Sequence, residues 1–587
     1  MRITELFRLS DVKAAWLDFA GLLRSFTGRS PQRRTPCDTR PPSQQPSLLI
    51  VLQTLALAVL LPIASEAAVP HTPVHAEGLS APLFSPACSF YIAPAGDDTH
   101  TGASTTDPWR TFTHALAQLQ PGDTLCLLDG IYTQPLDIRV SGTETQPLTI
   151  RALHDGQAVI DGEYLHAACQ VKDSQNVILE GVICRRSAGD VVLVVNAQRI
   201  IIRRVSAYDV RATDCNCQAF GTNNAEDVLF EDAIAGGRAR TSFTLYNSRR
   251  ITVRRAYARW QEEPTSDSMG VNNLMQIYGT NESLAENNVG TLAGQTQNEV
   301  LGWGVWNHIY NTDPIASENT FIGNIAFDLT HAGFFDTTCR WQTRHNTFLN
   351  NASINNRFGM WQRGDDSQIL TNFIHTGGEM GFFMRETSPD GECEPVDGFS
   401  LGSTLTGSVF LSVQGPVFNI LQTNIPKTLT HETNLYWDNE SIEMELSGSE
   451  SDTVDPVFNT ERWGYGAYLF PDPVSPRYSG GQDYAYLGAD IRYRSEDGVE
   501  TGEPLWPWPM EERICDELGV SVTWELSDQV SASTGERCAG GLWKTLDGVY
   551  EQQEQTFNDI PPGFWAYDEI EALYRAGYIA GCSAEPR

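Results

Sequence analysis

Four segments of this chain repeat one pattern without gaps, and this repeat restricts the fold more than any other feature. They begin at Asp173, Asn196, Asn224 and Asn247 (DSQNVILEGV, NAQRIIIRRV, NAEDVLFEDA and NSRRITVRRA), at steps of 23, 28 and 23 residues. Each has Asp or Asn, a small residue, two polar residues and then a short, largely apolar strand. Steps of this length match one coil of a parallel β-helix, in which each coil buries its apolar face against its neighbours.

Two columns of this alignment have a physical meaning. The leading Asp and Asn residues are expected to stack at one bend, where their side chains bond to the turn backbone and to each other. A second column alternates in charge along successive coils: Glu180, Arg203, Glu231 and Arg254. Opposite charges on neighbouring strands contribute only about 0.2–1 kcal/mol per pair, but they oppose register slippage. We interpret both columns as structural.

Further along the chain, GVWNHI, GFFDTT, GMWQRG and GFFMRE align from Gly304, Gly333, Gly359 and Gly381. Side chains alternate across a strand, so each segment places one apolar residue inward and an aromatic residue on the opposite face. The residues expected inside are Val305, Phe334, Met360 and Phe382. The opposite face carries Trp306, Phe335, Trp361 and Phe383, together with His308, Thr337, Arg363 and Arg385.

This outer stripe has the chemistry of a carbohydrate-binding surface. Aromatic faces stack on sugar rings, and arginines pair with carboxylates or sulfates. The sequence therefore predicts carbohydrate binding by five residues: Trp306, His308, Phe335, Trp361 and Phe383. In the alternative interpretation the faces are reversed, or a loop covers the stripe, because large aromatic residues are usually buried.

A cluster of charged residues in the same coils is the candidate catalytic site: Asp336, Arg363, Asp365, Asp366 and Arg385. Glu386, His308, His331 and His375 are expected nearby. Proton abstraction beside a uronate carboxylate needs a base and a neutralising cation, and glycoside hydrolysis needs paired carboxylates. Acidic pairs can also bind calcium or simply end a strand. Calcium is therefore the one cofactor we consider, and we assign no metal ligands.

The N-terminal region predicts export. Residues 47–63 form an uncharged apolar run after an arginine-rich stretch and before Ser65-Glu66-Ala67, a small-x-small cleavage pattern. We expect a signal peptide over residues 1–67, with a linker over 68–87; an uncleaved signal anchor is the alternative, and would be the only membrane attachment. The net charge of −34 excludes a phosphate-tracking, nucleic-acid-binding role.

Twelve cysteines in an exported chain are expected to form disulfides. Proximity in the sequence suggests the pairs Cys88–Cys126, Cys169–Cys184, Cys215–Cys217, Cys339–Cys393 and Cys515–Cys538. A short amphipathic helix is predicted from Pro108 to Gln120, since its apolar residues lie on one side. Such a helix can cover the open end of a solenoid.

One stretch, with two short segments after it, resembles the N-terminal cap of right-handed parallel β-helix proteins with the pectin-lyase-like fold. It reads FYIAPAGDDTHTGASTTDPWRTFTHALAQLQPGDTLCLLDGIY, and the segments after it are GTETQPLTIRA and AVIDG. The resemblance covers roughly residues 88–495 and implies an all-β, right-handed parallel β-helix with a short N-terminal capping helix and a small helical C-terminal segment. We divide residues 88–515 of the chain into the cap and first coils (88–165), the β-helix (166–440) and a closing segment (441–515). This fold hosts lyases, hydrolases, epimerases and adhesins. Within residues 88–495 the pectate lyase signatures W-x-D-H and R-x-P-x-x-R are absent.

After a linker over residues 516–555, the segment FNDIPPGFWAYDEIEALYRAGYIAGC resembles the first half of an S-layer homology motif, which we place at 556–587. The matching residues are Asp559, Trp565, Ala566, Ile570, Leu573 and Gly577. Such motifs hold exported proteins on cell-wall polysaccharide; the alternative is an unrelated amphipathic helix.

Together these features predict an exported, cell-surface-associated, monomeric β-helix protein whose partner is a polysaccharide. Three functions stay open: a polysaccharide lyase or glycoside hydrolase acting over residues 304–386, a non-catalytic adhesin, and a structural surface-layer protein without a ligand. Absence of the known catalytic signatures favours binding over cleavage.

Overall fold

The computed structural model describes the following residues: 87–211, 215–261, 272–293, 299–306, 316–337, 343–362, 369–385, 403–421, 429–432, 434–442, 458, 465–469 and 487–526. The predicted signal segment, the S-layer homology motif and the linker beyond residue 526 lie outside them. No helix in these ranges has the length and apolar character needed to cross a bilayer.

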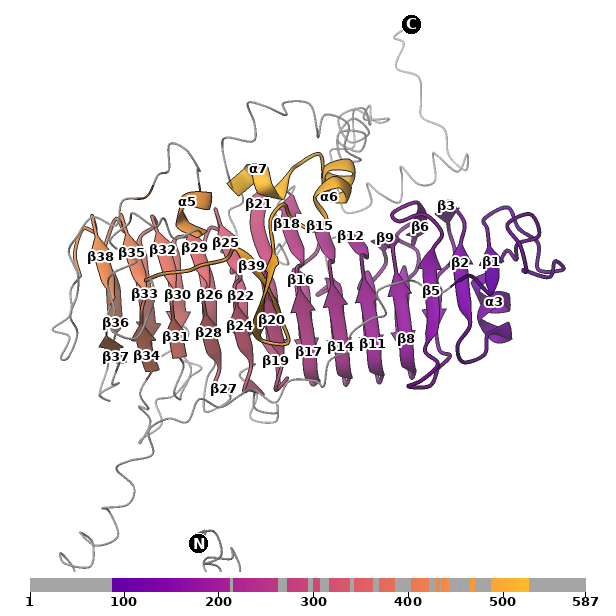
Figure 1. The fold of residues 1–587 in the computed structure, drawn as a ribbon, viewed down its shortest axis with the longest axis horizontal. Helices are drawn as coiled ribbons and strands as arrows, with labels where there is room; N and C mark the ends of the chain where they lie inside the picture. Colours follow the sequence, from indigo (N-terminus) through magenta and orange to yellow (C-terminus); the bar gives the residue numbers. More distant parts are fainter. Residues whose placement is uncertain are drawn as a thin grey trace, which may run out of the picture. The chain divides into compact units, whose positions relative to one another are not determined.

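The described chain winds through three long parallel sheets, one strand of each per coil, which confirms the predicted β-helix (Figure 1). Crossovers between parallel strands are right-handed in nearly all proteins. Sheet A comprises β1 (Phe90–Ile92), β2 (Thr124–Leu127), β5 (Leu148–Ala152), β8 (Gln175–Glu180), β11 (Gln198–Arg203), β14 (Glu226–Glu231), β17 (Arg249–Arg254), β20 (Leu284–Glu286), β24 (Thr320–Ile322), β28 (Thr347–Leu349), β31 (Ile369–Thr371), β34 (Ser403–Thr406) and β37 (Leu429–Glu432).

Sheets B and C complete each coil. Sheet B comprises β3 (Gly130–Tyr132), β6 (Ala158–Asp161), β9 (Val182–Ser187), β12 (Ser206–Val210), β15 (Ile234–Gly237), β18 (Tyr257–Gln261), β21 (Val289–Ala293), β25 (Ile325–Phe327), β29 (Ala352–Ile354), β32 (Ile374–Thr376), β35 (Val409–Leu411) and β38 (Leu435–Trp437). Sheet C comprises β4 (Leu136–Ile138), β7 (Cys169–Lys172), β10 (Val192–Val195), β13 (Gln218–Asn223), β16 (Thr241–Tyr246), β19 (Asn273–Tyr278), β22 (Trp303–Trp306), β26 (Ala332–Thr337), β30 (Phe358–Gln362), β33 (Met380–Arg385) and β36 (Phe418–Leu421). A small additional sheet pairs β23 (Ala316–Ser317) with β27 (Thr343–Arg344).

The four repeat segments form the strands β8, β11, β14 and β17 in the predicted register. The charge column pairs as expected: the guanidinium of Arg203 lies 3.1 Å from the Glu180 carboxylate, and that of Arg254 lies 2.8 Å from Glu231. The next coil continues the alternation with Glu286, which lies opposite Arg254 in β20.

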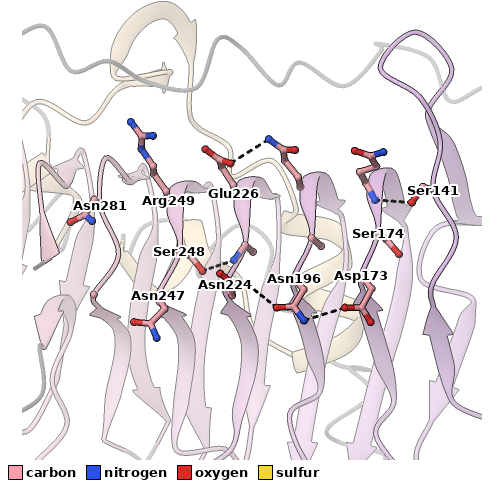
Figure 2. A pocket seen from close by; sticks show the side chains of 15 residues that line it. Ser141, Asp173, Ser174, Asn196, Asn224, Glu226, Asn247, Ser248, Arg249 and Asn281 are labelled. Atoms are coloured by element: carbon pink, nitrogen blue, oxygen red, sulfur yellow. Dashed lines mark hydrogen bonds between the residues drawn. The ribbon is translucent and has the colours of Figure 1, made fainter. Parts of the chain in front are cut away.

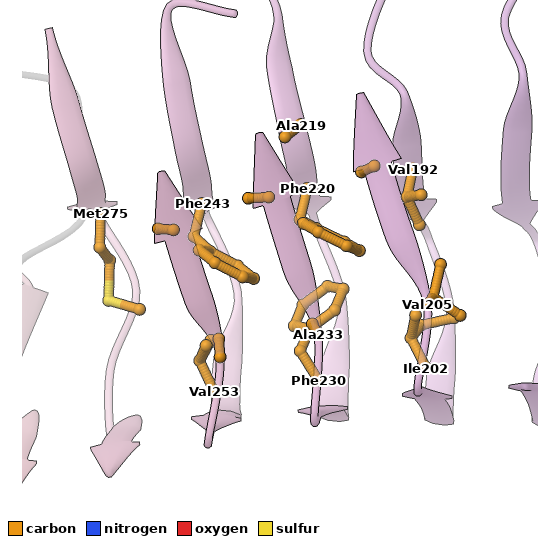
Figure 3. Packing of buried hydrophobic residues seen from close by; sticks show 14 of the residues in the cluster. Val192, Ile202, Val205, Ala219, Phe220, Phe230, Ala233, Phe243, Val253 and Met275 are labelled. Carbon is orange, nitrogen blue, oxygen red and sulfur yellow. The ribbon is translucent and has the colours of Figure 1, made fainter. Parts of the chain in front are cut away.

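The core consists of aliphatic and aromatic side chains stacked from coil to coil (Figure 3). Phe220 in β13 lies opposite Phe243 in β16, and the two rings stack with centroids 4.9 Å apart and an interplanar angle of 6°. Phe230 in β14 meets the Phe220 ring edge-on at 5.6 Å. Val192 and Met275 continue this column on either side of the two phenylalanines, so the core is built from contacts between neighbouring coils.

The predicted capping helix is present but shorter than expected, as α3 (Phe112–Gln118). Residues 108–111 are excluded from it because the Asp98 carboxylate accepts hydrogen bonds from the backbone N–H groups of Arg110 and Thr111, and Trp109 pairs with Ile92. Thr111 is the N-cap, and its hydroxyl accepts from the backbone N–H of His114. The four residues predicted on its apolar side are all buried: Trp109, Phe112, Leu116 and Leu119.

The segment 487–526 runs back over the outer face of sheet B, seen in yellow in Figure 1. It contains the antiparallel hairpin β39 (Tyr493–Glu496) and β40 (Val499–Pro504), then α6 (Glu511–Leu518) and α7 (Val522–Leu526); α5 (Gly466–Leu469) precedes it. Its apolar side chains pack on outward-facing residues of sheet B such as Ile183 and Tyr257. The boundary placed at residue 515 falls inside α6. We call residues 487–526 the closing strap.

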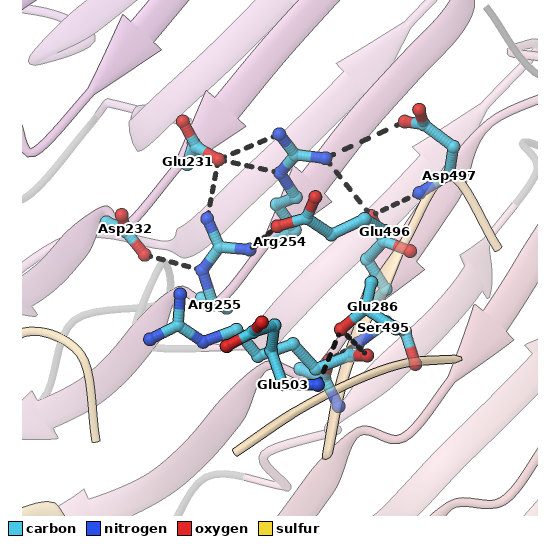
Figure 4. A network of polar contacts seen from close by, with 12 residues as sticks. Glu231, Asp232, Arg254, Arg255, Glu286, Ser495, Glu496, Asp497 and Glu503 are labelled. Carbon is cyan, nitrogen blue, oxygen red and sulfur yellow. Dashed lines mark hydrogen bonds and ion pairs between the residues drawn. The ribbon is translucent and has the colours of Figure 1, made fainter. Parts of the chain in front are cut away.

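Ion pairs join the hairpin of the strap to Arg254 of the charge column and to the adjacent Arg255 (Figure 4). Glu496 lies 3.2 Å from Arg255, and Asp497 lies 3.6 Å from Arg254. Glu286 is fully buried and accepts backbone hydrogen bonds from Asp497 and Gly498.

Three predicted disulfides are present: Cys88–Cys126, Cys169–Cys184 and Cys215–Cys217. Cys515 is also disulfide-bonded. Its expected partner Cys538, and the expected pair Cys339–Cys393, lie outside the described residues.

Candidate functional site

The aromatic residues predicted on the outer face of sheet C do gather there, as one cluster. Phe335 in β26 lies opposite Trp361 in β30, which lies opposite Phe383 in β33. Phe334, Met360 and Phe382 point into the main core on the other side. The predicted assignment of inner and outer faces is therefore confirmed for these coils.

The register of β22 differs from the predicted alignment by two residues. Gly304 lies opposite Phe335, and Trp306 lies opposite Thr337. The pairing of Trp303 with Phe334 puts Gly302 rather than Gly304 opposite Gly333. A Cβ on Gly304 would lie only 1.9 Å from the Phe335 carbonyl oxygen. An offset of two residues keeps a side chain on the same face, so Trp306 still joins the cluster.

The cluster has a buried floor and a partly exposed edge. Phe335 is 0% exposed and Trp361 8%, whereas Trp306 and Phe383 are only partly buried. The Trp306 ring meets Trp361 edge-on with centroids 6.0 Å apart, and Phe335 at 6.4 Å. A ligand would therefore reach Trp306 and Phe383 rather than the whole predicted stripe.

Two further residues complete the cluster: His331, which the sequence predicts near the candidate catalytic residues, and Arg357, which it did not single out. His331, 5% exposed, lies 4.8 Å from the Trp361 ring and 3.6 Å from the Glu299 carboxylate. Arg357 stacks over the Phe358 ring at 4.9 Å. Arg357 also pairs with the Glu379 carboxylate at 2.9 Å. The side chains of Arg363 and Arg385, which the sequence predicts on this face, lie outside the described residues.

Of the proposed catalytic residues, the structure describes Asp336 and the backbone of Arg385. Asp336 is fully buried on the inner side of β26, where the Asn346 carboxamide donates to its Oδ2 at 3.0 Å. It is therefore on the opposite side of sheet C from the aromatic cluster. Arg385 ends β33, and its backbone pairs with Leu421. The other predicted side chains lie outside the described residues: His308, Arg363, Asp365 and Asp366.

His375 is held inside the β-helix by Ser353, whose hydroxyl lies 3.1 Å from Nδ1. Burial lowers the pKa of His375 to about 4, so this imidazole is neutral near pH 7. Within the described ranges, no group of three or more His, Cys, Asp or Glu side chains is arranged to hold a metal ion.

Two tyrosines extend the aromatic surface toward the N-terminal coils. Tyr246 lies opposite Tyr278, with ring centroids 6.2 Å apart, and the adjoining Ile277–Val305 pairing places Tyr278 beside Trp306. Both belong to the column that begins with Lys172 and Val195. The register of the repeat could have identified Tyr246, because it directly precedes the segment that begins at Asn247. Tyr278 lies beyond the four segments.

A groove of about 780 Å³ lies at the bend between sheets C and A (Figure 2). One edge is the predicted column of carboxylate and carboxamide side chains: Asp173, Asn196, Asn224 and Asn247. The other edge is formed two residues later in each coil: Gln175, Gln198, Glu226 and Arg249. Between them the floor consists of small, buried residues: Ser174, Ala197, Ala225 and Ser248.

The local sequence explains this groove. The leading residue of each segment has a positive φ, from 45° at Asn247 to 51° at Asp173, and Asn and Asp tolerate this left-handed conformation better than other non-glycine residues. The small residue that follows turns inward, and Ser248 donates to the Tyr246 carbonyl at 2.7 Å. The third residue points outward. The Asn column stabilises the bend, as the sequence predicts, but no feature of the sequence predicted a groove beside it.

The comparisons with known proteins agree with this fold. A family model described as "Pel9A-like, right handed beta helix region" matches residues 90–235. A segment of 97 residues is 29% identical to the uncharacterized protein YwoF of Bacillus subtilis (strain 168), covering 16% of this chain and 20% of that protein. A segment of 80 residues is 34% identical to pectate lyase L of Dickeya chrysanthemi, covering 12% of this chain and 19% of that protein. The chain thus spans about a fifth of the length of the curated relatives it matches.

Solved structures are similar at low identity. Pectate lyase Pel9A is 14% identical, with a TM-score of 0.43, over 70% of this chain and 96% of its own. The PL6 family alginate lyase AlyGC is 13% identical, with a TM-score of 0.43, over 67% of this chain and 57% of its own. The family model and the three parallel sheets together identify the chain as a right-handed parallel β-helix protein.

Proposed function

We propose that this chain is an exported, cell-surface-associated protein that binds polysaccharide on the outer face of sheet C. The observation that supports this most is the aromatic cluster, in which partly exposed Trp306 and Phe383 rest on buried Phe335 and Trp361. An exposed ring held by buried rings is pre-organised to stack on a sugar, so little side-chain freedom is lost on binding.

Export is supported by the uncharged run at residues 47–63 and by the disulfides Cys88–Cys126 and Cys169–Cys184. Attachment to the cell wall would come from the S-layer homology motif at 556–587. One relative, over a short segment, is by its name a lyase of pectate, which is consistent with a polysaccharide partner.

Cleavage is the second candidate function. Arg363, Asp365 and Asp366 follow β30 almost immediately after Trp361 in the sequence. They are the catalytic residues that the sequence predicts, and in this second function they act on the bound sugar as base, acid or calcium ligands. Binding alone leaves the glycan intact, whereas cleavage shortens it, so one experiment distinguishes the two functions.

The test is affinity electrophoresis of the purified protein through gels containing neutral or uronate polysaccharides, followed by mass spectrometry of the incubated glycans with and without calcium. We expect retardation by at least one glycan, and a weakening of about tenfold for Trp306→Ala. Tyr493→Ala removes a partly exposed aromatic residue from the closing strap and should not change retardation. Shortened or unsaturated products would establish cleavage, whereas absence of retardation by every glycan would refute the proposal.

A further inference from the structure

We infer that the polar groove between sheets C and A binds an extended stretch of a neutral polysaccharide. This goes beyond the proposed function, because the groove lies at the bend of the N-terminal coils and does not include the aromatic cluster. Three properties of the groove favour this ligand: its hydrogen-bonding groups, their spacing and its charge.

The carboxamides of the groove keep unused hydrogen-bonding capacity. Asn196 donates one amide hydrogen to Asp173 at 3.1 Å and accepts from Asn224 at 2.8 Å, and both asparagines are exposed. A carboxamide has two donor hydrogens and two acceptor lone pairs, so each of these two retains a donor. Within the described part of the chain, the buried Oδ1 atom of Asn247 has no hydrogen-bond partner. Groups that both donate and accept suit sugar hydroxyls, which do the same.

The spacing of these groups favours a long ligand. Each coil contributes one side chain to each edge, and neighbouring coils are about 4.8 Å apart in the hydrogen-bonding direction. The groove extends from Ser141 to Asn281, so it crosses several coils. An extended chain lying along the β-helix meets the same type of donor and acceptor at every coil, whereas a compact ligand would use only a few of them.

The charge of the groove favours a neutral chain over a uronate chain. Asp173 and Glu226 place carboxylates on its two edges. The guanidinium of Arg249 is neutralised by Glu282 at 2.7 Å, and Arg139 at one end lies 3.0 Å from Asp173. The chain as a whole carries a net charge of −34. Arg199 lies beside one edge, where its guanidinium donates to the Gln175 carboxamide at 3.2 Å, so a single cation stands against two groove carboxylates. The carboxylates of Asp173 and Glu226 would repel a polyanion.

The test is isothermal titration calorimetry of the full chain with neutral xylohexaose and cellohexaose and with anionic hexagalacturonate. The double variant Gln175→Ala/Gln198→Ala removes two outward amides from one edge, and Gln157→Ala removes an exposed amide from a turn outside the groove. We expect a neutral hexasaccharide to bind the native chain, the double variant to lose about tenfold in affinity, and the control to lose none. Unchanged thermal melting would show that the double variant is folded.

Trp306→Ala separates this inference from the proposed function. If the groove binds independently, Trp306→Ala retains the affinity for the neutral hexasaccharide that Gln175→Ala/Gln198→Ala loses. The inference is overturned if neither neutral hexasaccharide binds at millimolar concentration, if hexagalacturonate binds more tightly than both, or if the double variant binds like the native chain.

Discussion

Replacement of Arg513 by methionine tests how the closing strap is held on sheet B. Arg513 is 7% exposed and lies in α6. Its guanidinium pairs with Glu517 and with Asp155 (2.9 Å), and donates to the Ser206 hydroxyl at 2.9 Å. The contact to Ser206 joins residues 307 positions apart, so this one side chain connects the strap to the N-terminal coils.

The expected loss follows from what Arg513→Met leaves behind. Glu517 is 5% exposed, so its carboxylate would remain buried without its cation. Removal of one partner from a buried ion pair destabilises a protein by about 3–5 kcal/mol. Arg513→Met/Glu517→Gln leaves no unpaired charge, and its Gln side chain can still accept the hydrogen bond that Tyr208 donates to Glu517. The double variant should therefore be more stable than the single variant.

Urea denaturation followed by limited proteolysis of the strap measures this effect. As a control, Arg139→Met removes a guanidinium whose side chain is 52% exposed and paired with Asp137, and it should lose only about 0–1 kcal/mol. If Arg513→Met unfolds at the same urea concentration as Arg139→Met, with an equally resistant strap, then the ion pairs of Arg513 do not hold the strap and the reasoning is wrong.

Two further predictions concern the core and the charge column. Phe220→Ala should destabilise the β-helix by about 3–5 kcal/mol, because it leaves a cavity beside the stacked ring of Phe243; a urea midpoint within error of the native value would contradict this packing. Burial raises the pKa of Glu286 from its ordinary value of 4.5 to about 7, against the opposing effects of backbone hydrogen bonds and Arg254. A raised pKa means that the folded state binds this proton more tightly, so the stability linked to it is full below about pH 4.5 and is lost as the pH rises through 7. Urea midpoints measured from pH 4 to 8 should fall less steeply for Glu286→Gln than for the native chain, and parallel curves would show that Glu286 is not the group responsible.

The coils could be predicted from the sequence because their determinants are local and recur. Asp173, Asn196 and Asn224 mark the same bend in successive coils, and their side chains bond to one another as expected. The charge column then indicated the register. A slip of one residue would move the apolar side chains out of the core and would separate the oppositely charged pairs. The capping helix was predicted for the same reason, from its apolar period, and only its start at Phe112 differed.

The features that could not be predicted depend on contacts between residues that belong to no repeat in the sequence. The strap reaches sheet B through pairs such as Arg513 with Ser206, for which no repeat exists in the sequence. Inside the later coils, the Asn324 carboxamide donates to the Ala285 carbonyl at 2.9 Å and to Asn351 at 3.1 Å. An asparagine in a polar sequence pattern looks like a surface residue, so its burial is visible only in the structure.

On the aromatic face, too, the sequence predicted one property of the side chains and missed another. Alternation along a strand predicted correctly that Phe335 and Trp361 lie on the outer face, but it cannot report what else packs there. Both rings are buried because Trp306 and neighbouring rings cover them. Tyr278 was missed because it follows the last of the four aligned segments.

The most direct test of polysaccharide binding is a crystal structure of the protein soaked with an oligosaccharide of the glycan that retards it most in gels. We predict a sugar ring stacked on Trp306 at the outer face of sheet C, next to Phe383. Density for the sugar only at sites away from sheet C, or no bound sugar at a saturating concentration, would contradict the proposed function.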